Sequence, residues 1–303
     1  MRHSRILSVA LAAASLAAMS GCPKKLPGGV PGAPNIPGGG GTSEVDPNTC
    51  GNYAVSDAGR RLHAFLEATA ELQAAVKETE QVEKTSCVMM GQELQMPAGD
   101  LQGTTQDVCA RVFTTLKDDL KVKVAKQPPI VVELKPAVCT IDADVEAKAA
   151  AECNGSASGG ATAGTGGNAA GGQAAAQCKA SAHLHASLNA SCSPPDLKIT
   201  LQKPVVVDTS RAELAVHAMT DGLPKILSVS GRIHILTDAI ANWSASAADL
   251  ANAGPTLARS FQDQAMCISG QIAAVGRAVT DVHASFQVQV QVSVQAQGSV
   301  SAQ

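Results

Sequence analysis

Two cysteine-bounded stretches of equal length decide the fold, CTIDADVEAKAAAEC at residues 139–153 and CKASAHLHASLNASC at residues 178–192. In both stretches small or apolar residues alternate with polar ones, which is the period of a half-buried β-strand. One antiparallel register sets both cysteines of the first stretch opposite those of the second. The disulfides that this register predicts are Cys139 with Cys192 and Cys153 with Cys178.

The register predicts an antiparallel hairpin of residues 129–153 with residues 178–201. Opposed Cβ atoms lie about 4.5 to 5.5 Å apart, which is close enough for a disulfide after a small adjustment. The register also pairs Glu133 with Lys198, Lys135 with Asp196, Glu146 with His185 and Glu152 with Lys179. Pro136 falls opposite Pro195, and since proline donates no ladder bond we expect a gap in the pairing there.

His183 and His185 stand on the polar face of the second strand, about 6.6 Å apart. With Glu146 across the hairpin they form a weak candidate for a surface metal site. Two histidines on a solvated face need no metal, however, and we interpret them as surface residues. The chain also contains no Ser-x-x-Lys, Gly-x-Ser-x-Gly, phosphate-loop or dinucleotide motif. We therefore predict no metal, no cofactor and no catalytic residue.

The N-terminus has the order of a secretory signal, with two arginines, an apolar middle and small residues before a cysteine. The apolar middle is shorter than the roughly 20 residues that cross a bilayer. Met19-Ser20-Gly21-Cys22 resembles the lipobox of bacterial lipoproteins, which implies cleavage before Cys22 and acylation of that cysteine. The alternative is ordinary cleavage near Ala17 or Gly21, which would leave Cys22 as a free thiol. Pro23 stands where the inner-membrane retention signal has aspartate, so we expect the outer membrane.

Composition divides the rest of the chain. Residues 22–49 are rich in Pro and Gly and predict a flexible tether of about 30 Å root-mean-square length. Residues 154–177 carry only small or polar side chains and predict a disordered loop. We therefore expect a signal peptide at 1–21, the tether, and one α+β domain at 50–303 that contains the loop.

The nine cysteines of this signal-bearing chain predict disulfides formed in an oxidising compartment. Without Cys22 the number is even, so four disulfides can use all the others. Outside the hairpin, Cys50, Cys87, Cys109 and Cys267 allow three connectivities. We favour Cys87 with Cys109 because these residues lie level in a helical hairpin. That choice leaves Cys50 with Cys267.

Apolar residues at steps of three and four predict about five helices. They cover residues 56–92, Thr104 to Leu120, Ser210 to Gly222, Leu223 to Leu250, and Leu257 to Val282. Gly222 with Pro224 and Gly254 with Pro255 are expected to separate the last three. Residues 286–297 alternate Phe, Val or Ala with Gln or Ser, which predicts a half-buried strand.

The predicted fold class is therefore α+β. We expect a helical bundle, with near-heptad spacing in its last helix, packed on an antiparallel meander. The disulfide-stapled hairpin and the C-terminal strand would form that meander. Its face of Ala and Val would meet the helices.

Composition also excludes some classes of partner. The net charge is −3, and no basic cluster follows Lys24 and Lys25, so a nucleic acid partner has no electrostatic footprint. One Trp, one Tyr and four Phe leave few rings for stacking on sugars. We predict neither nucleic acid nor glycan binding.

Several short segments carry a family resemblance. They are the lipobox cysteine, Asp46-Pro47, Cys50-Gly51, KPAVC at residues 135–139 and DQAMCISG at residues 263–270. In these the chain resembles a group of uncharacterised, disulfide-rich lipoproteins from predatory soil bacteria. Such relatives often have Cys-x-Gly-x-Cys repeats between the strands, which residues 154–177 lack. The resemblance covers most of the chain after Cys22 and implies no known activity.

The sequence therefore predicts a lipid-anchored, non-catalytic protein of the outer membrane with a structural or partner-binding role. Its expected partners are the membrane, through the N-terminal lipid, and another envelope protein. One alternative is a membrane-active, pore-forming-like protein whose amphipathic hairpin inserts into a bilayer. Another is a carrier of small apolar ligands between the sheet and the helices. The oligomeric state is left open.

Overall fold

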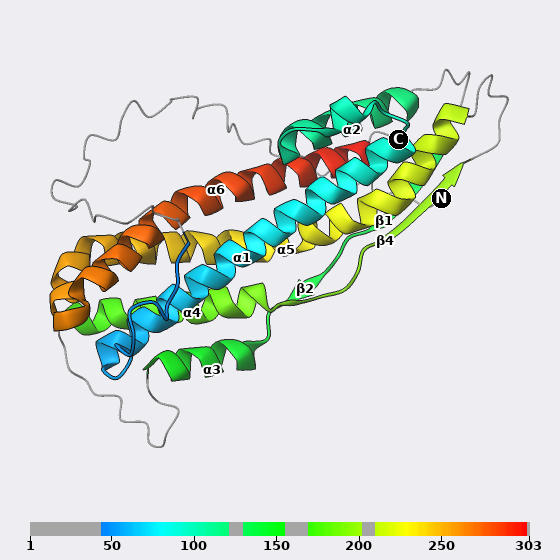
Figure 1. Ribbon diagram of the computed structural model, residues 1–303. Helices are drawn as coiled ribbons and strands as arrows, with labels where there is room; N and C mark the ends of the chain where they lie inside the picture. Colours follow the sequence, from blue (N-terminus) through cyan, green and yellow to red (C-terminus); the bar gives the residue numbers. More distant parts are fainter. Residues whose placement is uncertain (1–43, 121–129, 155–168, 202–209, 302–303) are drawn as a thin grey trace, which may run out of the picture. The chain divides into compact units, whose positions relative to one another are not determined.

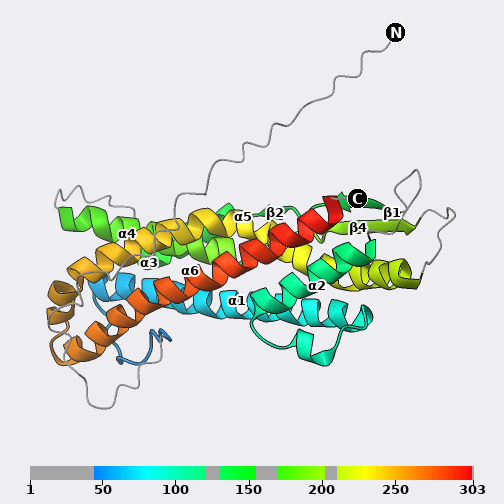
Figure 2. The ribbon, with the colours of Figure 1, turned by 90° about the horizontal axis from the view of Figure 1, so that it is seen from above.

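Three long helices carry the fold: α1 (Asp57–Glu93), α5 (Ser210–Arg259) and α6 (Ala265–Ser301). The structure is a computed structural model that describes residues 44–120, 130–154, 169–201 and 210–301. The three helices lie side by side in both views (Figure 1, Figure 2). At a rise of about 1.5 Å per residue, α5 alone is about 75 Å long.

The first helical hairpin forms where the sequence predicts it. Ser56 caps α1 by accepting a hydrogen bond from the Gly59 N–H at 3.0 Å. A short 3₁₀ turn, η1 (Ala98–Leu101), follows α1, and α2 (Thr105–Leu120) comes next. Thr104 Oγ1 accepts the Asp107 N–H at 3.2 Å, so Thr104 caps α2. α2 lies against the second half of α1 (Figure 1).

The predicted breaks within α5 are wrong, because α5 continues through both glycine–proline pairs. A proline removes only one helical hydrogen bond, and here the two glycines serve close packing instead. A Cβ on Gly222 would lie 2.1 Å from Met90 Cγ of α1. A Cβ on Gly254 would lie 3.1 Å from Ile272 Cγ2 of α6. The glycines therefore allow α5 to approach its neighbours and do not end it.

The hairpin register is confirmed over its outer part. β1 (Ile130–Lys135) pairs with β4 (Asp196–Leu201), and β2 (Cys139–Thr140) pairs with β3 (Ser191–Cys192). Lys135 Nζ lies 3.1 Å from Asp196 Oδ2, as the register requires. The two prolines fall between the two short ladders, where a gap was expected.

The inner part of the predicted hairpin is wrong. Residues 143–154 and 169–188 form helices α3 (Ala143–Asn154) and α4 (Ala169–Leu188). Alanine is the strongest helix former, and Asp142 Oδ1 accepts the Asp144 N–H at 2.9 Å to start α3. α4 packs against α1, α3 and α5, so it buries polar Ser181 and Ser187 together with its alanines. Alternation of small and polar residues therefore did not mark a strand here.

The amphipathic hairpin on which the membrane-active alternative depends is thus helical in its inner part. The predicted disordered loop is wrong at its two ends, because Asn154 belongs to α3 and residues 169–177 belong to α4. Residues 155–168 lie outside the described residues. We call residues 130–154 and 169–201 the stapled arm.

The predicted C-terminal strand is wrong as well, because α6 continues to Ser301. The buried residues follow helical steps of three and four; they are Phe286, Gln289, Val292, Ser293 and Ala296. Val294, which the alternation would bury, is 61% exposed. Gln289 is tolerated inside because its Nε2 donates to Val76 O of α1 at 2.9 Å. A polar residue that finds a partner can thus replace an apolar one at a core position.

The buried residues form two cores along α1, α5 and α6. The Trp243 core gathers Phe65, Leu72, Leu184, Ile240, Trp243 and Val275 with their neighbours. The α2 core gathers Cys87, Cys109, Val112, Leu116, Met219, Leu223 and Val292 with theirs. Leu134, Leu197 and Ile199 of the stapled arm pack against the α2 core. The β1–β4 sheet thus contributes to the α2 core, and α4 contributes to the Trp243 core.

The chain before α1 is folded from the first described residue onward. Val45 is 3% exposed, and its backbone N–H donates to Gln73 Oε1 of α1 at 3.0 Å. The folded unit therefore includes residues 44–49, which the sequence assigns to the tether. No helix in the described ranges has both the length and the apolar character needed to span a membrane.

Candidate functional site

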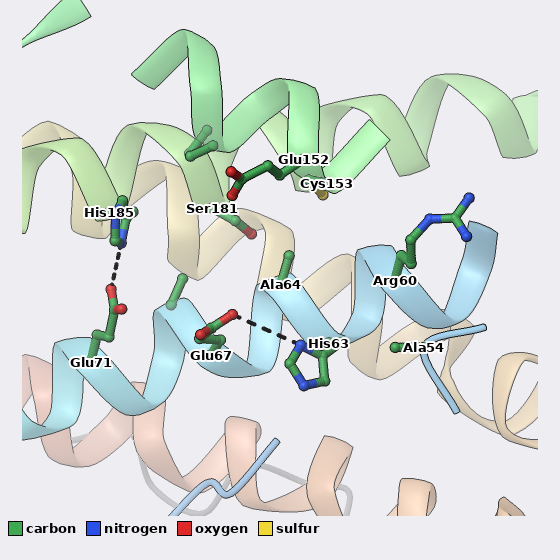
Figure 3. A pocket seen from close by; sticks show the side chains of 13 residues that line it. Ala54, Arg60, His63, Ala64, Glu67, Glu71, Glu152, Cys153, Ser181 and His185 are labelled. Atoms are coloured by element: carbon green, nitrogen blue, oxygen red, sulfur yellow. Dashed lines mark hydrogen bonds and ion pairs between the residues drawn. The ribbon is translucent and has the colours of Figure 1, made fainter. Parts of the chain in front are cut away.

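A pocket of about 280 Å³ lies where α3 and α4 meet the first half of α1 (Figure 3). We call it the α1–α3–α4 pocket. Its lining residues are small or charged: Ala54, Arg60, His63, Ala64, Glu67, Ala68, Glu71, Ala149, Glu152, Cys153, Ser181, Ala182 and His185. The small alanine side chains leave the volume of the pocket open, and the longer charged side chains surround that volume.

The floor of the pocket is one stripe of α1. Arg60, His63, Glu67 and Glu71 recur at steps of three and four, so the helix brings them to one face. His63 Nδ1 lies 3.8 Å from Glu67 Oε2. The Arg60 guanidinium pairs with Asp57 on the same helix. These contacts are within α1, so the stripe exists independently of the stapled arm.

The opposite wall is held in place covalently. Cys153 at the end of α3 forms a disulfide with Cys178 of α4, with Cα atoms 5.5 Å apart. Glu152 therefore stands beside a fixed helix–helix junction and faces the pocket (Figure 3). The hydroxyl of Ser181 donates to Gln177 O at 2.9 Å. α3 and α4 thus form one unit that closes over the stripe of α1.

Two histidines of α4 contact carboxylates, one on α1 and one on α3. His185 Nδ1 lies 2.8 Å from Glu71 Oε2 of α1, across the pocket. His183 Nδ1 lies 3.3 Å from Glu146 Oε1 of α3. The sequence pairs Glu146 with His185, and this pairing is wrong. Residues two apart point the same way on a strand but to different sides of a helix, so the two rings are separated.

The structure does not bring the candidate metal ligands together. His183 and His185 face carboxylates on different helices, and Glu146 contacts only the first of them. Within residues 44–120, 130–154, 169–201 and 210–301, no three His, Cys, Asp or Glu side chains are grouped so that they could hold a metal ion.

The segment before α1 supports the open end of the pocket. The Tyr53 hydroxyl donates to Pro47 O at 2.8 Å, and its ring packs near the rings of His63 and Phe261. Burial raises the pKa of Tyr53 to about 12, with a further contribution from the carboxylates of Asp46 and Glu67. Bonds from the Thr49 hydroxyl and the Asn48 N–H hold the pKa of Asp46 below its ordinary value.

The four disulfides have the connectivity that the sequence predicts. The structure joins Cys50 with Cys267, Cys87 with Cys109, Cys139 with Cys192 and Cys153 with Cys178. The Cys153–Cys178 bond forms between two antiparallel helices and not between two strands, because both arrangements bring residues at matched distances from a turn together. The lipidation candidate, Cys22, lies outside the described residues.

Chemically, the pocket is suited to holding a cationic group. Its carboxylates are Glu67, Glu71 and Glu152, while its one guanidinium is already paired with Asp57. The sulfur of Cys153 is in a disulfide, so it offers no thiolate. A basic side chain or a small amine could approach two or three carboxylates and displace a histidine from its partner.

Most of this pocket cannot be predicted from the sequence. The stripe from His63 to Glu71 is visible as a charged helix face, but a charged face is ordinarily solvated. The docking of α3 and α4 turns this face into a pocket, but the alternation of small and polar residues in those segments predicts strands. Comparison with protein-family models, curated proteins and solved structures finds no match to the chain.

Proposed function

We propose that the protein is a lipid-anchored, non-catalytic envelope protein whose helical domain recognises a partner. The observation that carries the proposal is that the cysteines are paired in disulfides. All eight cysteines within the described residues are joined in four disulfides. Disulfides of this number form and persist outside the cytosol. The ninth cysteine, Cys22, follows the signal-like segment and is the one that acylation would use.

In this proposal residues 1–21 are removed, Cys22 carries the lipid, and the Pro- and Gly-rich segment holds the domain away from the membrane. Because Pro23 follows the cysteine, the outer membrane is the proposed location. The α1–α3–α4 pocket is the proposed recognition site, because it gathers carboxylates from α1 and α3 on a disulfide-held frame. A basic group of an envelope partner matches its charge.

The anchor is tested by mass spectrometry of the mature protein and by fractionation of the envelope. We expect a diacylated or triacylated N-terminal Cys22 in the outer-membrane fraction. Cys22→Ser should give a protein without lipid that leaves this fraction, while Lys24→Ser should behave like the wild type. A mature wild-type chain that begins elsewhere, or that lacks lipid mass, would refute the anchor.

Recognition is tested by crosslinking in the native envelope. We expect Glu67→Gln combined with Glu152→Gln to weaken capture of a partner at the pocket. Glu78→Gln, an exposed change on the same helix, is the matched control. Equal capture by the double variant and the control would refute the pocket as the recognition site. It would not affect the proposal that Cys22 carries a lipid.

A carrier of small apolar ligands is the second candidate, and the groove that favours it lies between helices α1 and α6 and not between the sheet and the helices. The groove of about 800 Å³ lies between Val45, the middle of α1 and Asp281–Ser285 of α6. Val45, Val76 and Val282 are its buried apolar residues, and carboxylates stand among its other lining residues. Native mass spectrometry should then show a bound lipid-sized mass that Ala74→Trp displaces. A ligand-free wild-type mass would count against the carrier.

A further inference from the structure

The α2 core contains a carboxylic acid that is sealed from solvent. Glu83 on α1 is 0% exposed. Neither of its carboxyl oxygens has a hydrogen-bond partner in the part of the chain that the structure describes. Buried carboxylates are ordinarily paired or hydrogen-bonded, because an unpaired buried charge is strongly disfavoured. Glu83 is therefore an exception that calls for a physical explanation.

The contacts on either side of Glu83 show that α2 covers it. One turn before it, Glu80 accepts a hydrogen bond from the Thr105 hydroxyl of α2 at 3.1 Å. One turn after it, Cys87 is bonded to Cys109 of α2. Cys109 Sγ also lies 3.9 Å from Glu83 O. α2 thus lies against α1 at the level of Glu83.

α6 packs against both α1 and α2, and it contributes buried polar groups of its own. Gln289 of α6 reaches Val76 O, and Ser293, one turn further along, is buried with an Oγ that has no partner among the described residues. α2 also reaches this part of α6 directly, through the Gln106–Gln291 side-chain hydrogen bond at 2.6 Å. Glu83 and Ser293 are thus unpartnered polar groups on two helices that α2 packs against.

Among the described residues, no hydrogen bond or ion pair compensates Glu83. Glu80, on its own helix, has the same sign. The buried residues that α2, α5 and α6 contribute here are uncharged. Several cations of α1, α2 and α5 have partners elsewhere: Lys84 donates to Gly103 O, Arg111 to Asp100 O, Arg211 pairs with Asp119, and Lys225 contacts Met89. The neutral, protonated form of Glu83 is therefore the form that this packing accepts.

We propose that α2 is a proton-controlled latch. It lies against α1 and α6 while the Glu83 carboxyl is protonated, and it separates from them when that carboxyl ionises. The Cys87–Cys109 disulfide keeps the separated helix attached one turn from Glu83, so the latch closes again when the proton returns. Opening gives water access to Glu83 and Ser293, which removes the cost of two unpaired buried groups.

The direction of the pH dependence follows from linkage. Burial, and secondly the Glu80 carboxylate, raises the pKa of Glu83 from 4.5 to about 8. The closed form then holds a proton that the open form loses, so closing weakens as the pH rises from about 4.5 to about 8. Over that range the ratio of open to closed molecules increases by up to about tenfold per pH unit.

Hydrogen exchange of the full chain tests the latch, read by mass spectrometry on peptides from α2 at pH 6 and pH 8. After correction for the intrinsic exchange rate, protection of α2 amides in the wild type should fall by about 50-fold between the two values. Glu83→Gln is isosteric and cannot ionise, so its α2 protection should change by less than about twofold. Peptides from α4 report on the Trp243 core and should not change.

Glu78→Gln supplies the matched control, because Glu78 lies on the same helix and is exposed. It should keep the full response of the wild type. Equal loss of protection in the wild type and in Glu83→Gln would overturn the latch. So would unchanged α2 protection in the wild type, or a loss spread equally over α2 and α4.

Discussion

The two cores share three helices but treat their buried polar groups differently. In the Trp243 core the indole N–H donates to Thr69 Oγ1 at 2.9 Å, and the Thr69 hydroxyl donates to Phe65 O at 2.7 Å. In the α2 core Glu83 and Ser293 are equally buried but unpartnered within the described residues. The polar groups around Trp243 are therefore satisfied by the fold alone, although the Ser187 hydroxyl of α4 is buried without a partner among the described residues. In the α2 core one of the unpartnered groups is a carboxyl, which the proposed latch keeps neutral by a proton.

The largest loss of stability is expected when a disulfide is removed, and comparing one disulfide from each core tests whether the two cores are stabilised independently. Cys153→Ala with Cys178→Ala opens a loop of 25 residues and should lower the free energy of unfolding by about 3 kcal/mol. Because α4 carries Leu184 into the Trp243 core, hydrogen exchange should increase in α4. Cys87→Ala with Cys109→Ala should instead increase exchange in α2. If both double variants gave one exchange pattern, the cores would not be independent.

The second prediction removes a hydrogen-bond acceptor from the Trp243 core. Thr69→Val keeps the shape but leaves the Trp243 N–H without its acceptor, which should cost about 2 kcal/mol. Urea unfolding followed by the fluorescence of the single tryptophan measures this loss. Thr114→Val serves as control because Thr114 is exposed on α2, and its effect should stay below about 0.5 kcal/mol. Comparable losses in the two variants would mean that the Thr69–Trp243 bond is not important for stability.

The third prediction concerns pH. Since the folded pKa of Glu83 is about 8 and its ordinary value is 4.5, the group costs stability as the pH rises between these values. From pH 6 to pH 7 the wild type should lose up to about 1.4 kcal/mol more than Glu83→Gln. Urea titrations of both proteins at the two pH values give the difference. If the wild type and Glu83→Gln lost equal stability between pH 6 and pH 7, Glu83 would already be ionised in the folded protein.

The smallest effect is expected at the α1–α3–α4 pocket. His185→Gln removes a half-exposed pair with Glu71 and should cost about 0.5 kcal/mol. Urea titrations of the variant and of the wild type measure this loss. His217→Gln, on an exposed position of α5, controls for the change of side chain. If His185→Gln lost no more stability than the control, the His185–Glu71 pair would not contribute to stability.

The sequence predicted the disulfides and the strand register because both depend on matched distances along the chain. It failed at α3, α4 and the end of α6 for a different reason. Alternation predicts a strand only if polar side chains face solvent, and here Ser181 and Gln289 are buried with hydrogen-bond partners. Neither the pocket nor the covered Glu83 can be read from α1 alone, because docking of α3, α4 and α2 decides which faces are buried.

The proposed latch depends on the protonation of one side chain, Glu83. Carbon-13 labelling of glutamate allows the carboxyl carbons to be followed by NMR through a pH titration, and Glu83→Gln identifies the signal of Glu83. We expect that signal to titrate with a midpoint near pH 8 while the exposed glutamates titrate several pH units lower. A Glu83 midpoint near 4.5 would show that the carboxylate is ionised inside the closed α2 core and would contradict the latch.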